Sequence, residues 1–211
     1  MKYYRKMHSA HGFLDWWPGD SALEVCVGAI LTQNTNWQNV EKALANLKNA
    51  DKLSLGALYE IEKTSLSELI RPAGYFRVKA NRLKNFINFV WNFSPGNLTA
   101  FLNQPIEILR ANLLEVNGIG PETADSIVLY AANLPSFVVD AYTMRIFTRH
   151  KLIQKSDKYD AVKAFFEANL PADVELFKDY HGQIVETAKR YCKKKPQCDL
   201  CPLKGFEHDC K

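Results

Sequence analysis

The feature that most constrains this chain is a turn with two glycines between two stretches of helical pattern. Gly118 and Gly120 stand in the segment 113–124, Leu-Leu-Glu-Val-Asn-Gly-Ile-Gly-Pro-Glu-Thr-Ala. Glycine allows a tight turn and a close approach of the backbone to a partner. Free N–H groups at the start of the helix that follows can hold a phosphate, and such a contact binds DNA without reading its sequence. Taken alone, the motif is weak evidence, because a simple turn between helices also produces it.

Helical periodicity continues through most of the chain, whereas no convincing alternating strand pattern or hairpin dipeptide appears. Capping residues and N-terminal prolines mark the expected helix starts. They are Ser21 with Glu24, Asn36, Ser65 with Glu68, Pro105, Pro121 and Asp140. Further expected helices cover 75–91, 159–169 and 174–190, and those that start at Pro105, Pro121 and Asp140 run to Leu113, Ala132 and Thr148. The pattern therefore predicts an all-α fold.

Length and composition set broader limits. The chain has 211 residues, enough for one substantial core or two small lobes. Its 47% hydrophobic and 24% charged residues argue against a disordered chain. A run of about eighteen apolar residues is missing, and so is the apolar core of a secretory signal, so we expect a soluble cytoplasmic protein. The net charge of +4 permits a polyanionic partner without establishing one.

A single carboxylate follows the glycine turn by about twenty residues. The apolar run 137–139 delivers Asp140 to the expected start of a helix. Asp140 could serve only as an N-cap. The same position favours the ionised carboxylate, which an electrostatic catalyst or water activator needs, so the two roles are compatible.

Four of the five cysteines lie in the last twenty residues, with five, two and eight residues between them. Cysteines clustered in this way in a reducing compartment indicate a metal site rather than disulfides. The set is Cys192, Cys198, Cys201 and Cys210, and His208 could replace Cys210 as a ligand. The nearby cations are Lys189, Arg190, Lys193, Lys194 and Lys195; they suit phosphate contacts but could also be a solvated tail. Cys26 lies in an expected core helix and is interpreted as an inert thiol.

Together these motifs resemble the helix-hairpin-helix DNA glycosylases of the endonuclease III superfamily. The matching order is an early Q-x-T motif at Gln33, the segment Ala73-Gly74-Tyr75-Phe76 with Lys79-Ala80, the pattern L-x-x-V-x-G-I-G-x-x-T-A, V-V-D at Asp140, and the cysteine tail. The resemblance implies a six-helix barrel lobe over 20–130 with the hairpin at 113–132. It also implies a second helical lobe from 1–19 and 131–190, and an iron–sulfur loop at 191–211.

The resemblance also implies how such a chain handles DNA. The target base leaves the stack and enters a pocket, since the glycosidic bond is inaccessible in a stacked duplex. Asp140 matches the residue that stabilises the oxocarbenium-like sugar and helps water to attack, and Gln33 matches the residue that fills the gap left by the flipped base. The hairpin contacts to DNA fall on Gly118, Ile119, Gly120 and Thr123, together with the basic tail residues Lys193, Lys194 and Lys195. Double-stranded DNA with a damaged base is the implied partner, bound by a monomer.

One position departs from the strand-cutting members of the family. Those members carry a lysine where this chain has Glu122, and that lysine forms a Schiff base with the sugar. A carboxylate cannot act as that amine, so we expect a monofunctional enzyme without AP lyase activity. The alternative is that Glu122 is only an exposed first-turn acid and that a lysine elsewhere substitutes.

Aromatic residues near the N-terminus and after the Q-x-T motif resemble the 3-methyladenine branch of the family. In that branch the positions of Trp16, Trp17 and Trp37 line the base pocket, and a glutamate stands at the position of Glu122. Lys189 and the segment His181-Gly182-Gln183 resemble its later motif, although Gln183 replaces a lysine. Indole faces bind cations and stack on bases, which suits a positively charged alkylpurine. The same tryptophans could simply pack in the core.

The family tail has six, two and five intervening residues, so this chain keeps the central spacing but departs at both outer intervals. The resemblance favours a [4Fe–4S] cluster, with zinc as the alternative because four-cysteine zinc sites tolerate varied spacing. The expected activity is hydrolysis of the N-glycosidic bond of alkylated purines, 3-methyladenine first, in base excision repair. The alternatives are an endonuclease III-like glycosylase with lyase activity, a mismatch glycosylase acting on pyrimidine lesions, and a non-catalytic DNA-binding module.

Overall fold

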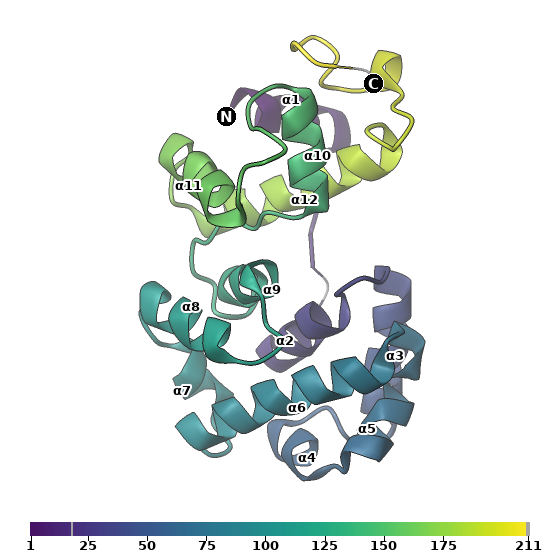
Figure 1. The fold of residues 1–211 in the computed structure, drawn as a ribbon, viewed down its shortest axis with the longest axis vertical. Helices are drawn as coiled ribbons and strands as arrows, with labels where there is room; N and C mark the ends of the chain where they lie inside the picture. The colour runs from purple at the N-terminus through teal and green to yellow at the C-terminus, as the bar shows by residue number, and fades with distance from the viewer. Residues whose placement is uncertain (18, 210–211) are drawn as a thin grey trace. The chain divides into compact units, whose positions relative to one another are not determined.

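The computed structural model describes residues 1–17 and 19–209, and within these residues it contains helices and no strand. Its contacts divide the chain into two compact units, drawn in Figure 1. The hairpin unit spans residues 19–134, and the terminal unit combines residues 1–17 with 135–209. The all-α prediction is confirmed. No helix of the described chain is both long enough and apolar enough to cross a membrane.

The hairpin unit is built around a helix that is apolar on all sides. In α2 (Ala22–Leu31), every residue from Glu24 onward is buried, which is the pattern of a central helix. It contacts α3, α6 and α9 (Figure 1). The helical segments of this unit are α2 (Ala22–Leu31), α3 (Trp37–Asn49), α4 (Leu55–Glu60), α5 (Lys63–Leu69), the 3-10 turn η1 (Arg71–Ala73), α6 (Phe76–Phe93), α7 (Leu98–Leu102), α8 (Ile106–Glu115), α9 (Pro121–Ser126) and the π turn η2 (Ile127–Ala131).

The terminal unit joins the two ends of the chain around one long helix. Its segments are α1 (Lys2–His11), α10 (Ala141–Arg149), α11 (Tyr159–Asn169), α12 (Val174–Arg190) and the 3-10 turn η3 (Cys198–Leu200). Helix α12 contacts both α1 and α10. Phe137 is fully buried and stacks on Phe166 at 4.3 Å between ring centroids, with Phe177 edge-on at 5.4 Å. This aromatic core packs the segment before α10 against α11 and α12.

Several expected helix starts are correct in detail. Asn36 accepts a hydrogen bond from Asn39 N and begins α3, while α11 and α12 have the expected bounds. Ser21 accepts from Glu24 N, as expected, but the Glu24 carboxylate accepts from Asp20 N instead of completing a capping box. The box is therefore only half formed.

Other expectations are wrong. Ser65 does not start a helix, because α5 begins two residues earlier and Leu66 N already bonds to Glu62 O within its first turn. The helix expected over 121–132 is divided, because the Ala132 N–H bonds to Ile127 O five residues back and forms a π turn. Helices α1, α4 and α7 were not anticipated, since α4 and α7 are too short to show periodicity and α1 is mostly polar.

Candidate active site

The turn between α8 and α9 uses its two glycines differently. Gly118 has φ +96°, in the region that L side chains rarely adopt, and a Cβ there would collide with the Arg82 side chain. Gly120 has φ −96° and ψ 178°, which any residue can adopt, and nothing lies within 4 Å of a Cβ placed on it. Gly118 is thus required by the fold itself. Gly120 is exposed at the N-cap of α9, where the missing side chain leaves the backbone accessible to a partner.

Gln33 braces this turn from inside the hairpin unit. Its Nε2 donates to Gly118 O at 3.1 Å and to Thr123 Oγ1 at 3.0 Å, and its Oε1 accepts from Arg82. All of these partners lie on or beside the hairpin. Filling a gap in a base stack, the role the resemblance assigns to this side chain, would therefore require it to exchange contacts that it already makes. The Ile119 side chain is buried below the turn.

Lys79 carries no accessible amine. Its side chain is 1% exposed and donates from Nζ to Leu31 O at 2.8 Å and to Ala73 O at 2.7 Å. Burial, together with the smaller effect of the nearby Arg82 charge, lowers the pKa of Lys79 to about 8. The lysine joins the end of α2 to the turn η1. Glu122, by contrast, is exposed in the first turn of α9.

In the terminal unit, Asp140 is the N-cap of α10. Its Oδ1 accepts from Thr143 N at 2.7 Å and from Thr143 Oγ1 at 2.8 Å, which forms a capping box. Its Oδ2 faces His181 Nε2 at 3.6 Å. Burial raises the pKa of Asp140, but His181 and the Thr143 donors outweigh it and hold the pKa below the ordinary value of 3.8. Asp140 is therefore a carboxylate at neutral pH.

Trp16 lies against α12 close to this carboxylate. Its ring is edge-on to His181 at 6.5 Å between centroids, and Lys189 Nζ lies 5.5 Å from the ring centroid. Asp140, His181 and Trp16 thus form a continuous series within one unit. His181 was not selected as a site residue from the sequence. The signal for it was present, because it opens the His-Gly-Gln segment that carries the resemblance.

The other residues expected to line a base pocket are distributed between the units. Trp17 is half-buried in the terminal unit and has φ +76°, a left-handed conformation that is rare for a tryptophan. Trp37, half-buried at the first position of α3, and Glu122 belong to the hairpin unit. The structure thus brings Trp16 and Lys189 together, with Asp140 two contacts away.

Three thiols line one hollow of the cysteine loop. Cys192, Cys198 and Cys201 share it with Arg149 and His208. Arg149 Nη1 donates to Cys192 Sγ at 3.0 Å. Cys210 lies outside the described residues, and among those described no three His, Cys, Asp or Glu side chains converge as ligands of one metal ion. Three thiols on one hollow, one of them beside a guanidinium, fit a thiolate-ligated group.

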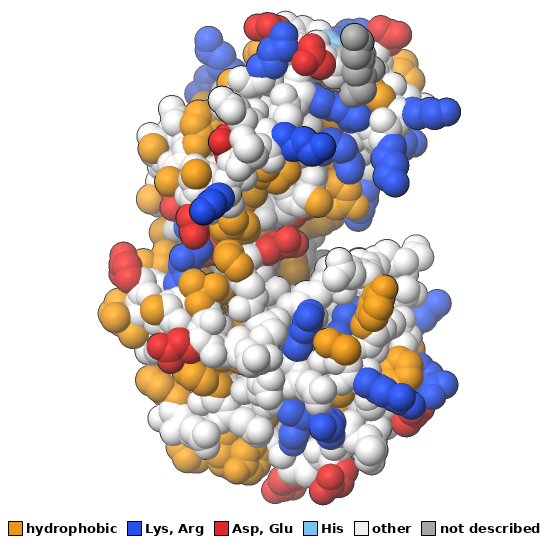
Figure 2. Space-filling view, in the orientation of Figure 1, with side chains coloured by type: hydrophobic (Ala, Val, Ile, Leu, Met, Phe, Trp, Pro, Cys, Tyr) orange, Lys and Arg blue, Asp and Glu red, His pale blue; other side chains and the backbone are white. Residues whose placement is uncertain are grey.

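The basic tail is anchored by its backbone. Arg149 also donates to Lys193 O at 2.7 Å and to Lys194 O at 3.2 Å. The side chains of Lys193, Lys194 and Lys195 stay exposed. Figure 2 shows lysine and arginine side chains gathered over this end of the terminal unit. A fixed backbone with exposed ammonium groups suits contacts to a polyanion.

Comparison with known proteins identifies the family. A family model described as HhH-GPD superfamily base excision DNA repair protein matches residues 27–172. A Methanocaldococcus jannaschii protein named "Putative DNA repair glycosylase" is 50% identical over 206 residues, which are 97% of this chain and 94% of that protein. The endonuclease III of Sulfolobus acidocaldarius is 23% identical over 182 residues, which are 85% of this chain and 78% of that enzyme.

Solved structures agree. The H. pylori 3-methyladenine DNA glycosylase bound to 1,N6-ethenoadenine has a TM-score of 0.75 and 30% identity, covering 90% of this chain and 96% of that one. A non-covalent endonuclease III–DNA complex has a TM-score of 0.81 at 20% identity, covering 97% and 92%, and shares the fold. The chain therefore belongs to the HhH-GPD superfamily of base excision DNA repair proteins and is a DNA glycosylase of that superfamily.

Proposed function

We propose that this glycosylase is monofunctional and hydrolyses the N-glycosidic bond of alkylated purines, with 3-methyladenine as its first substrate. One observation carries the proposal: an ionised Asp140 and the Trp16 indole are joined through His181 in a single unit. A carboxylate beside an aromatic surface supplies both parts that such a reaction needs. The likeness to the H. pylori 3-methyladenine enzyme, at 30% identity over 90% of this chain, supports the same choice.

The chemistry asks little of the protein, because an N-alkylated purine already carries positive charge. Water attacks C1′ of the sugar, the C1′–N bond breaks, and its electron pair leaves with the base, which departs neutral. Asp140 stabilises the positive charge that develops on the sugar and accepts the proton of the attacking water. The low pKa of Asp140 keeps it ionised for both tasks. No general acid is required for the leaving group.

Base recognition falls to the tryptophans. The flipped base stacks on Trp16 beside Lys189 in the terminal unit, with Trp17 of the same unit as a further aromatic surface. Trp37 and Glu122, which belong to the hairpin unit, are assigned to base recognition by the resemblance alone. Stacking of one base on an aromatic side chain contributes about 1–3 kcal/mol, and a cationic base adds a cation–π term of about 0.5–2 kcal/mol. Trp16 is only half-buried in the terminal unit, so part of the indole is exposed.

A single copy of the chain binds DNA, and it does so through contacts that do not depend on the base sequence. The backbone around Gly118, Ile119 and Gly120, with Thr123, binds the phosphates of one strand, and Lys193, Lys194 and Lys195 bind further phosphates. None of these contacts reads a base, which suits an enzyme that must find a lesion in any sequence. Gln33 fills the vacated stack after leaving its hairpin contacts.

Two positions support the proposed lack of lyase activity. Position 122 holds a carboxylate, which cannot form a Schiff base. Lys79 is 1% exposed and already engaged with two carbonyl oxygens, so it cannot reach a sugar. The product is therefore an intact strand with an abasic site.

The cysteine loop holds a [4Fe–4S] cluster, for which Cys192, Cys198, Cys201 and Cys210 supply the thiolates. The bound cluster would crosslink the loop and so contribute structure rather than chemistry at the sugar. Arg149 supports the loop by hydrogen bonds to Cys192 Sγ and to the backbone of Lys193. Zinc is the alternative, and metal analysis with visible absorption near the iron–sulfur charge-transfer bands separates the two.

N-methylated duplex DNA tests the activity. Purified wild type and Asp140→Asn are incubated with it, the released bases are identified by chromatography, and strand breaks are measured before and after alkali. We expect 3-methyladenine from wild type only, with breaks only after alkali. Breaks without alkali, or a borohydride-trapped adduct, would contradict the monofunctional assignment. No released base would discard alkylpurines, and uracil, thymine and oxidised-pyrimidine duplexes would then be tried.

A further inference from the structure

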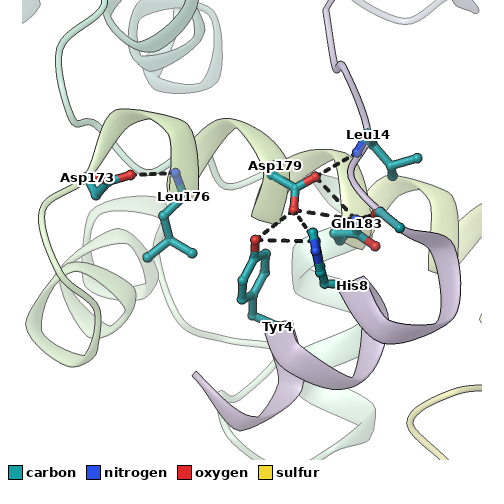
Figure 3. A network of polar contacts seen from close by, with 8 residues as sticks. Tyr4, His8, Leu14, Asp173, Leu176, Asp179 and Gln183 are labelled. Carbon is teal, nitrogen blue, oxygen red and sulfur yellow. Dashed lines mark hydrogen bonds and ion pairs between the residues drawn. The ribbon is translucent and has the colours of Figure 1, made fainter.

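A buried carboxylate holds the N-terminal segment of the chain on α12. Asp179 is 2% exposed and accepts hydrogen bonds from Tyr4 OH at 2.8 Å, His8 Nδ1 at 2.9 Å and Leu14 N at 3.0 Å (Figure 3). These donors stand between 165 and 175 residues away in the chain. A buried carboxylate that accepts three such bonds is strongly committed to this geometry, since breaking any of them leaves a buried polar group unsatisfied.

Gln183 makes a second tie one helical turn further along. Its Nε2 donates to Gly12 O at 2.6 Å and to Asp179 Oδ1 at 3.2 Å. The side chain is fully buried, and its Oε1 has no hydrogen-bond partner among the described residues. Only the donor half of the amide is in use. Position 183 therefore requires a donor, which a lysine would supply equally well.

Between these ties the Trp16 ring lies directly on the helix backbone. A Cβ on Gly182 would stand 2.9 Å from both Trp16 Cβ and Trp16 Cγ, closer than real contacts allow. Glycine is thus the only residue type at position 182 that allows this close approach without a shift of the Trp16 side chain or the helix. Trp16 follows Leu14 by two residues, so the bond between Leu14 N and Asp179 fixes the chain just before the indole.

We propose that Asp179 and Gln183 are positioning residues that hold Trp16 on Gly182 as a preformed wall for the flipped base. The inference rests on the proposed function only for what Trp16 does. The clamp, which consists of the hydrogen bonds that join Asp179 and Gln183 to the N-terminal segment, is a property of the free protein. A wall that is already in place loses less conformational freedom when the base arrives, so binding is stronger than with a mobile indole. Position 183 also acquires a rationale, because glutamine and the lysine of the related branch share the donor that the clamp uses.

The clamp can be tested without DNA. The chain has four tryptophans, so incorporation of 5-fluorotryptophan gives four ¹⁹F resonances, of which Trp16→Phe identifies one. We expect Asp179→Ala, Gln183→Met and Gly182→Ala each to shift or broaden the Trp16 resonance. Gln183→Lys keeps the donor and should leave the resonance in place. Asp173→Ala removes a carboxylate that caps the same helix at Leu176 N and takes no part in the hydrogen bonds of Asp179 and Gln183, so it serves as the matched control.

The same variants are then compared in single-turnover base release from methylated DNA. We expect the enzyme concentration at half-maximal rate to rise about tenfold in Asp179→Ala and Gln183→Met, with a smaller change in the maximal rate, because the indole binds the base before and during the reaction. Gln183→Lys should recover most of the affinity. A variant that merely loses active protein would lower the amplitude instead.

The outcomes separate the two proposals. An unchanged Trp16 resonance in both Asp179→Ala and Gln183→Met overturns the clamp, whatever the activity. A shifted resonance together with a wild type that releases no 3-methyladenine supports the clamp and rejects the proposed substrate. If Asp179→Ala does not fold, the pair Gln183→Met and Gln183→Lys decides alone, and equal spectra for that pair overturn the donor requirement.

Discussion

The hairpin unit and the terminal unit each bury an ionisable side chain, but they use it in opposite ways. In the hairpin unit, Lys79 donates to two backbone carbonyls, Leu31 O and Ala73 O, which are 48 and 6 residues away in the chain. In the terminal unit, Asp179 accepts from three donors at least 165 residues away, including Leu14 N, and also from Gln183 on its own helix. One buried charge joins segments within a single contiguous unit, whereas the other joins the N-terminal segment to a helix near the C-terminus.

The same contrast extends to the sites. The hairpin turn and its brace Gln33 come from one contiguous unit and offer backbone groups that suit any DNA sequence. The carboxylate Asp140 and the indole of Trp16 come from segments far apart in the chain and meet through His181 on α12. The hairpin and its brace thus lie within one contiguous unit, although Gln33 is 85 residues from Gly118, and the proposed chemistry joins segments from both sides of that unit in the sequence. The two should be separable by mutation.

The largest separation is expected for Asp140→Asn. Asparagine is as good an N-cap as aspartate, so α10 should keep its start, but the negative charge beside the sugar is lost. We expect base release to fall by about 10²–10³-fold, the usual effect of removing one electrostatic group from a reacting centre. Affinity for undamaged duplex should stay within about twofold, because the hairpin is in the other unit.

The control for this change is Asp173→Asn, which makes the same substitution at the N-cap of α12. It should leave base release near the wild-type rate. Equal losses in the two variants would mean that the effect arises from helix stability. Retained activity in Asp140→Asn would remove this carboxylate from the mechanism.

The two hairpin glycines provide the next comparison. Gly118→Ala forces a side chain into φ +96° and against Arg82, so the free energy of unfolding should fall by about 1–3 kcal/mol. Gly120→Ala has an ordinary φ and open space, so stability should change by less than about 0.5 kcal/mol. Its methyl group should instead weaken DNA binding by obstructing the exposed backbone. Urea unfolding and DNA titration check both effects, and a reversed order would contradict the assignment.

Gln33→Ala tests the brace from the other side of the turn. It removes the donor to Gly118 O and Thr123 Oγ1 and the acceptor for Arg82, so the hairpin should loosen. We expect affinity for undamaged duplex to weaken about tenfold. Gln38→Ala, at an exposed glutamine of α3, should change nothing.

Gln33→Ala also distinguishes the two roles of Gln33, which are bracing the hairpin and filling the space of a flipped base. If it only fills the space of a flipped base, binding to undamaged duplex will be unchanged and only the reaction on damaged DNA will slow. The ¹⁹F resonance of Trp16 should be unaffected in either case, because the indole belongs to the terminal unit.

What the sequence could and could not predict follows the same division. Motifs within one stretch, such as the hairpin around Gly118 and the cap Asn36, produced correct local structure because their partners are a few residues away. The residues that join distant segments were missed or left open. Asp179 has no local signature, since its partners include Leu14 N. Gln183 departs from the branch motif, and only the folded structure supplies the reason, which is its bond to Gly12 O. The helix start predicted at Ser65 is wrong because a capping pattern can also occur by chance inside a helix, as it does here in α5.

The smallest expected effect concerns the buried cation of the hairpin unit. The pKa of Lys79 is lowered to about 8, below its ordinary 10.5, so the unfolded chain binds a proton that the folded chain releases between these two values. Stability contributed by this group must therefore rise as the pH increases through that window, and the cost of the buried charge is fully present below about pH 8. Between pH 8 and 9 the gain should be about 1 kcal/mol.

The measurement is urea unfolding at both pH values for wild type and Lys79→Met. Lys79→Met should be less stable than wild type at both pH values, because two carbonyls lose their donor. Its free energy of unfolding should lack the rise of about 1 kcal/mol that wild type shows between pH 8 and 9. Other groups that titrate in the window, including Lys84, whose pKa is also lowered by burial, cancel in the difference. If the same rise in the free energy of unfolding appears in Lys79→Met, a group other than Lys79 must release the proton. It would also break the parallel between Lys79 and Asp179 as the charges that organise their respective units.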